Sequence, residues 1–175
     1  GVLLEALAAL PPDIYWRLIH IGGGELLPAL RRRAEALGLQ RRIEWRGAQD
    51  QDAVIQAYRA ADLFVLASRV AASGDRDGLP NVLMEAQATG LACLSTRVSA
   101  IPELIDDGRT GRLIAPDDSA GLAASLATLI GDPAARLSLG AAGATRVRRA
   151  FAFDRGLDRL AVKFGLASER RAQPA

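Results

Sequence analysis

The stretch of the sequence best suited to chemistry is a pair of carboxylates separated by a glycine-proline segment. Asp77 lies near the end of a long polar loop, residues 68–81, and Glu85 follows in the next segment. The loop runs out through Asp77-Gly78-Leu79-Pro80-Asn81. Loops of about fourteen residues are uncommon in compact domains and are often functional. We therefore predict that this loop binds a ligand.

Residues 80–89 after the loop are expected to form a helix, with proline in the first turn and Gly90 just past the end. The free N–H groups and positive dipole at its start favour an anion by about 0.3–1 kcal/mol per interaction when exposed. A carboxylate on a helix is usually a surface charge. The apolar neighbours of Glu85, however, predict a helix buried on most sides. A carboxylate in that setting requires hydrogen-bond donors, and sugar hydroxyls would serve.

Two other loops follow apolar, strand-like runs. The first contains Gly22-Gly23-Gly24, where glycines would let the backbone approach a ligand closely and the next helix would offer N–H groups. Three glycines after a strand make an ordinary tight turn equally well. The second spans residues 97–102, where Ser99 and Ala100 are small enough to leave room for a ligand, although a plain connection explains them as well.

These loops must be positioned by the elements between them. Strands are expected at residues 15–21, 43–46, 63–67, 92–96 and 112–114. Helices are expected at residues 2–10, 25–37, 51–61, 80–89, 102–105, 119–130 and 134–150, with a last helix after Asp154. In the helix at 51–61, Val54, Ile55 and Tyr58 share one side.

Apolar strands that alternate with helices predict a Rossmann-like, doubly wound parallel sheet. Ligands bind such a sheet outside the carboxyl ends of its strands, which is where all three loops lie. We expect one domain over residues 1–165 and a frayed tail over residues 166–175.

The composition argues against several other classes of function. The formal net charge of +2 gives no strong signal for nucleic-acid binding. One cysteine, Cys93, lies in an apolar run and is expected to be a buried core residue, which suits a reducing cytoplasm. With His20 as the single histidine, we expect no metal site. No apolar run is long enough to span a membrane.

At this point the residues resemble a known family. Residues 77–86 with Ala88-Thr89-Gly90 look like the E-x7-E signature of the retaining family-4 glycosyltransferases, glycosyl transferases group 1, which have the two-domain GT-B fold. Further matches occur in the family's order at residues 1–6 (KGxxxLLEA after its lysine), 18–25 (LxIxGxGxE), 43–47 (IxFxG), 60–68 (AADxFVLPS) and 101–111 (xPExIxDGxTG). Together they cover nearly all of residues 1–165, so the resemblance is to the C-terminal, donor-binding domain.

The resemblance implies a role for each candidate residue. Asp77 would face the donor sugar as the catalytic carboxylate, and Glu85 would hold the ribose hydroxyls. The backbone of residues 78–81 would lie near the sugar and the diphosphate, and Arg46-Gly47 near the base. The complete implied donor-binding set is Gly22, Gly23, Gly24, Arg46, Gly47, Ser68, Gly78, Leu79, Pro80, Asn81 and Glu85. No cofactor is implied beyond the nucleotide-diphosphate sugar substrate.

Two departures from the family pattern matter. The first carboxylate is Asp77, one methylene shorter than the family's glutamate, which makes the sugar contact less certain. The family's first strand, with the arginine and lysine that neutralise the diphosphate, would lie before Gly1. That strand is central in a doubly wound sheet. We therefore predict either an unfilled strand position between the strands at 15–21 and 63–67, or those two strands brought together.

The function expected from the sequence is thus the donor half of a retaining glycosyltransferase of hexosyltransferase type, in cell-surface polysaccharide biosynthesis. Its partners would be the nucleotide-sugar donor and an N-terminal acceptor-binding domain of the same protein, and the chain alone would be inactive. We expect a cytoplasmic location, with any peripheral attachment to the inner membrane face made through that other domain. The alternative is a non-catalytic nucleotide-sugar-binding module or remnant. A dehydrogenase is disfavoured because no G-x-G-x-x-G motif is present.

Overall fold

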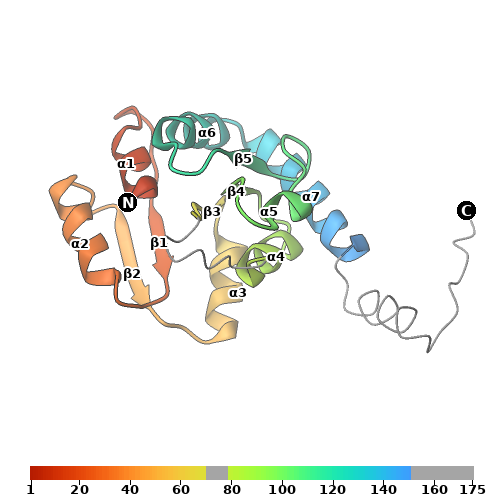
Figure 1. Cartoon of the computed structure of the whole chain (residues 1–175), viewed down its shortest axis with the longest axis horizontal. Helices are drawn as coiled ribbons and strands as arrows, with labels where there is room; N and C mark the ends of the chain where they lie inside the picture. The colour runs from red at the N-terminus through yellow and green to blue at the C-terminus, as the bar shows by residue number, and fades with distance from the viewer. Residues whose placement is uncertain (70–78, 151–175) are drawn as a thin grey trace, which may run out of the picture.

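The computed structural model describes residues 1–69 and 79–150, in which helices and strands alternate along the chain (Figure 1). The helices are α1 (Val2–Ala8), α2 (Leu27–Ala36), α3 (Gln51–Ala60), α4 (Asn81–Ala88), α5 (Ile101–Leu104), α6 (Ser119–Gly131) and α7 (Pro133–Ala150). The strands are β1 (Leu18–Ile21), β2 (Ile43–Gly47), β3 (Phe64–Leu66), β4 (Cys93–Thr96) and β5 (Arg112–Ile114). This order confirms the predicted α/β alternation.

The strands form two parallel sheets instead of one. β1 pairs with β2, and β3, β4 and β5 pair in that order. Within residues 1–69 and 79–150, no strand pairs with the second edge of β1 or of β3. The predicted unfilled strand position is thereby confirmed, and the alternative, in which β1 and β3 pair directly, is excluded.

One apolar core joins the two sheets on one face. It combines the inner sides of α1, α2 and α6 with one side chain or more from every strand, for example Leu18 of β1, Ile43 of β2 and Leu94 of β4. α1 packs against α6, which closes this layer over the junction between the sheets (Figure 1).

A second core lies on the opposite face and belongs to the larger sheet. Tyr58 of α3, Leu83 of α4 and Leu104 of α5 pack there against Cys93 and Leu113. Ile19 and Ile21 of β1 belong to neither core of the described residues. The β1–β2 sheet therefore has one covered face, whereas the β3–β4–β5 sheet has two.

The strands next to the unfilled position are less buried than their sequences predict. Every residue of β1 and β3 is half-buried, whereas every residue of β4 is buried. An apolar run predicts burial only when the strand has neighbours on both edges. The run at 15–21 also begins too early in our prediction, because Tyr15 is 81% exposed and the strand begins at Leu18.

Several smaller predictions are settled by the described residues. Cys93 is fully buried, and burial raises the pKa of its thiol, so it is a core residue and no nucleophile. The helix expected after Asp154, the tail at 166–175 and most of the loop after Ser68 lie outside the described residues.

Candidate functional site

The glycine loop after β1 and the end of β2 lie side by side. The Gly22 N–H donates to the Gly47 carbonyl oxygen at 2.8 Å, which extends the β1–β2 pairing past the end of β1. Gly22 and Gly24 adopt φ values of 134° and 111°, which side chains rarely tolerate. Two predicted donor-binding segments are thus brought together at the carboxyl end of this sheet.

Arg46 lies next to this loop but its guanidinium is already engaged. Its Nε donates to Glu44 Oε1 at 2.8 Å, and Arg17 contacts the other oxygen of the same carboxylate at 2.5 Å. The hydrogen bond from Arg46 is the main reason that the pKa of Glu44 is lowered. A ligand at this loop would therefore meet the Arg46 backbone more readily than its free charge.

Ser68, at the exit of β3, is held through its backbone. The hydroxyl of Thr96 donates to the Ser68 carbonyl oxygen at 2.6 Å, and the hydroxyl of Ser95 donates to the Leu66 carbonyl oxygen at 2.8 Å. Both hydroxyl residues are buried in β4. They anchor the beginning of the long loop to the sheet. The sequence signal that we missed is the pair of hydroxyls ending an otherwise apolar strand.

α4 begins at Pro80 without a side-chain cap from any described residue. Leu79 and Pro80 are half-buried, whereas Asn81 is exposed. Other helices of the domain do have aspartate caps: Asp50 for α3, Asp118 for α6 and Asp132 for α7. The start of α4 therefore keeps the capacity for an anion that the sequence predicts.

Glu85 lies on an exposed side of α4, which corrects the prediction of a helix buried on most sides. Leu83 and Ala86 are fully buried, but Val82 is 41% exposed. The prediction failed because residues one or two positions apart point to different sides of a helix, so the apolar neighbours at i±1 and i−2 do not surround Glu85. Val82, at i−3, does share the side of Glu85 and is itself exposed. The Glu85 carboxylate is accessible to a ligand without being desolvated.

Glu85 has one polar neighbour that the sequence analysis did not assign to the site. The Tyr58 hydroxyl lies 3.4 Å from Glu85 Oε2 and 3.3 Å from the Val82 carbonyl oxygen. Two causes raise the pKa of Tyr58 to about 12: burial, which is the larger, and the negative charge of Glu85. The hydroxyl is thus protonated, and a donor, near neutral pH.

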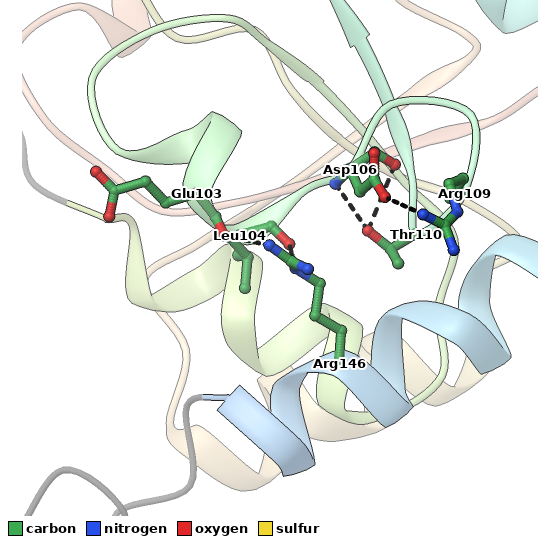
Figure 2. A network of polar contacts seen from close by, with 6 residues as sticks. All are labelled: Glu103, Leu104, Asp106, Arg109, Thr110 and Arg146. Atoms are coloured by element: carbon green, nitrogen blue, oxygen red, sulfur yellow. Dashed lines mark hydrogen bonds and ion pairs between the residues drawn. The ribbon is translucent and has the colours of Figure 1, made fainter.

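The third loop, residues 97–100, leads into α5, which is fixed from below by α7 (Figure 2). Arg146 donates from Nε to the Leu104 carbonyl oxygen and from Nη2 to the Glu103 carbonyl oxygen, both at 2.7 Å. A cation at the last carbonyls of a helix complements its dipole. The loop itself places Ser99 at a φ of 49°, a left-handed conformation unusual for serine.

The turn of residues 106–110, beside the contact of Arg146 with α5, is held by a hydrogen bond and an ion pair within the turn. Thr110 Oγ1 accepts from the Asp106 N–H at 2.9 Å, and Arg109 pairs with the Asp106 carboxylate at 3.1 Å (Figure 2). These contacts make the segment after α5 a rigid connection to β5, and they leave its residues no evident role toward a ligand.

The remaining site predictions fall outside what the structure describes or stay untested by it. Asp77 and Gly78 lie in the segment 70–78, outside the described residues. Among the residues that are described, no three His, Cys, Asp or Glu side chains cluster so as to hold a metal ion. No helix of the described part is both long and apolar enough to cross a membrane.

Comparison with known proteins finds a glycosyltransferase family model and individual glycosyltransferases. Residues 1–132 match the family model described as glycosyl transferases group 1. The amylovoran biosynthesis glycosyltransferase AmsK of Erwinia amylovora is 38% identical over 109 residues, which are 62% of this chain and 27% of AmsK. The D-inositol 3-phosphate glycosyltransferase of Corynebacterium glutamicum is 33% identical over 146 residues, or 79% of this chain and 34% of that protein. The chain thus spans about a quarter to a third of the length of these relatives.

A solved structure extends the similarity to the fold. Anabaena HepE, crystallised in complex with UDP, superposes with a TM-score of 0.83 at 22% identity. The match covers 95% of this chain and 44% of HepE.

Proposed function

The chain belongs to the glycosyl transferases group 1 family, and from that premise we propose that it binds a nucleotide-diphosphate sugar as the donor part of a retaining glycosyltransferase. The observation that carries the proposal is the position of the signature. Glu85 and the uncapped start of α4 lie within the residues that match the family, next to the β3 exit in a Rossmann-like fold.

The chemistry of the loops supports a phosphorylated, hydroxyl-rich ligand. The start of α4 offers N–H groups to a diphosphate, and an exposed carboxylate one turn further along can accept hydrogen bonds from ribose hydroxyls. Beside the Gly22–Gly47 hydrogen bond, the exposed Gly23 and Gly24 offer backbone groups to a ligand. Solved relatives support this choice of ligand, since HepE was crystallised with UDP and with UDP-glucose.

In the proposed reaction, Asp77 faces the anomeric carbon and the departing nucleotide diphosphate is stabilised by the start of α4. Positive ends of dipoles aimed at developing negative charge lower the barrier, because they need no reorganisation during the reaction. The acceptor would be bound by a second domain of the protein. AmsK and the inositol phosphate enzyme differ in their products, so the family leaves the acceptor open.

A role in cell-surface polysaccharide biosynthesis is supported by AmsK, whose name places it in amylovoran synthesis. A cytoplasmic location, with peripheral attachment to the membrane through the second domain, is part of the same proposal. The alternative of a non-catalytic binding module predicts the same ligand without turnover.

The test is a calorimetric titration of UDP-glucose, GDP-mannose and ADP-glucose into the protein as its gene encodes it. One nucleotide sugar should bind with micromolar affinity, and Glu85→Ala should weaken it at least tenfold, or about 1.4 kcal/mol. The control is Glu35→Ala, which removes another exposed helical glutamate, in α2. Equal binding by wild type and Glu85→Ala would refute the proposed donor site, and binding without sugar transfer would favour the non-catalytic module.

A further inference from the structure

Tyr58 has a fixed ring and a hydroxyl that reaches the candidate site. The side chain is 8% exposed and packs edge-on against the Phe64 ring of β3, with centroids 5.6 Å apart and planes at 83°. Apolar contacts of this kind hold an aromatic ring in one rotamer. The position of the hydroxyl is therefore set by the core, before any ligand arrives.

The hydroxyl faces two acceptors of α4, and its single proton can be donated to one of them at a time. It lies within hydrogen-bonding reach of the Val82 carbonyl oxygen, in the first turn, and of the Glu85 carboxylate, one turn later. Within the described part of the chain, it is the polar group that contacts the Glu85 carboxylate. Glu85 as a whole is exposed within the described part of the chain.

We propose that Tyr58 is a positioning residue, which orients the Glu85 carboxylate for donor binding through its hydroxyl; the inference rests on the proposed function of Glu85. An exposed glutamate otherwise samples several rotamers, and ordering it on binding costs free energy. A hydroxyl on a rigid ring lowers that cost because one carboxylate oxygen is already engaged. The other oxygen is left for the ligand.

The state of the hydroxyl suits this role. Because the pKa of Tyr58 is raised to about 12, the phenol remains neutral at any pH at which the enzyme would work. A neutral phenol donates to a carboxylate, whereas a phenolate would repel it.

The experiment is a double-mutant cycle on nucleotide-sugar binding in the protein as its gene encodes it. The variants are Tyr58→Phe, Glu85→Ala, the double variant and the control Tyr15→Phe. Phenylalanine keeps the ring and its contact with Phe64 but removes the hydroxyl. Tyr15 is the only other tyrosine of the chain and is exposed, so its substitution controls for the loss of a hydroxyl as such.

The probe is whichever of UDP-glucose, GDP-mannose and ADP-glucose the wild type binds. With it, Tyr58→Phe should raise Kd about threefold to tenfold. Tyr15→Phe should leave Kd unchanged. In the Glu85→Ala background, Tyr58→Phe should change Kd less than about twofold, because its partner is gone. Thermal melting of each variant reports whether the fold is retained.

Three results would overturn the inference. Unchanged binding by Tyr58→Phe would show that the hydroxyl does not act on the donor. The same loss of affinity in both backgrounds, with a lower melting temperature, would assign Tyr58 a purely structural role. If instead Glu85→Ala binds as wild type does, or none of the three nucleotide sugars binds the wild type, the proposed function itself fails and the inference fails with it.

Discussion

The two sheets of this domain are built from the same βα units but are buried to different extents. The β3–β4–β5 sheet has helices on both faces and a central strand, β4, that is buried throughout. Among the described residues, one face of the β1–β2 sheet is covered by a core, and its other face carries Ile19, Ile21 and the ion pairs of Glu44. A parallel strand is expected to be apolar on both faces, but burial follows only when both faces and both edges are covered.

The difference shows that most of the packing that stabilises the domain belongs to the larger sheet. The larger sheet carries the second core. The contact of Arg146 with α5 and the hydroxyls that hold the end of β3 also belong to it. The smaller sheet offers a glycine loop and exposed backbone with little packed mass behind one face. We expect substitutions to reveal this asymmetry, with large losses of stability in one sheet and small losses in the other.

The largest contrast is expected from truncating one apolar side chain in each sheet. Leu94→Ala, in fully buried β4, should lower the free energy of unfolding by about 3 kcal/mol through lost burial and a cavity. Ile19→Ala, on the uncovered face of β1, should lower it by about 1 kcal/mol. Urea unfolding followed by circular dichroism measures both. Equal losses would mean that the uncovered face is packed in solution.

A second contrast adds a methyl group instead of removing one. At Gly140 of α7, a Cβ would overlap the carbonyl oxygen of Gly90, so Gly140→Ala should cost about 2 kcal/mol as α7 is pushed away from the turn after α4. Gly23 lies in the loop of the smaller sheet with no atom within 4 Å of its Cβ position. Gly23→Ala should change stability by less than about 0.5 kcal/mol. An equal decrease in melting temperature for the two variants would contradict the comparison of the sheets.

The smallest expected effect is a pH dependence of the free energy of unfolding, which comes from His20 in the smaller sheet. Burial, as the main cause, lowers the pKa of His20 in β1 below its usual 6.5, so the folded state binds its proton less readily than the unfolded state. Stability contributed by the neutral ring is present above pH 6.5 and is lost as the pH falls through the lower, folded-state pKa.

The loss should be smaller than in either contrast above, because His20 is half-buried and solvent screens its charge. Unfolding free energies at pH 7.5 and 5.5 should differ for wild type and not for His20→Gln, since the chain has no second histidine. A variant that keeps the full pH dependence would assign the titration to another group.

The sequence predicts the order of elements well because glycine, proline and apolar runs act locally. It also predicts that the glycine loop follows the end of β1, and the Gly22–Gly47 bond joins that loop to the end of β2. It fails where burial depends on partners distant in the chain. β1 and β3 look buried in sequence, but in the structure each lacks a neighbour on one edge.

The candidate site shows the same limit. Glu85 was identified from its motif, but its exposure depends on which side of α4 faces the sheet. Tyr58 was placed on the apolar side of its helix, alongside Val54 and Ile55, and nothing in that pattern distinguishes a core aromatic from one whose hydroxyl reaches a carboxylate. That contact joins residues 27 positions apart and is visible only in three dimensions.

Within residues 1–69 and 79–150, β1 and β3 each have one unpaired edge, and this has a practical consequence for work with this chain. Each edge presents a row of N–H and C=O groups that can accept an extended segment from a neighbouring molecule. Self-association through such edges rises with protein concentration, so the chain should be purified dilute and stored cold only briefly. The same edges make it a natural recipient for a short synthetic strand, and hence a starting point for a two-piece complementation sensor.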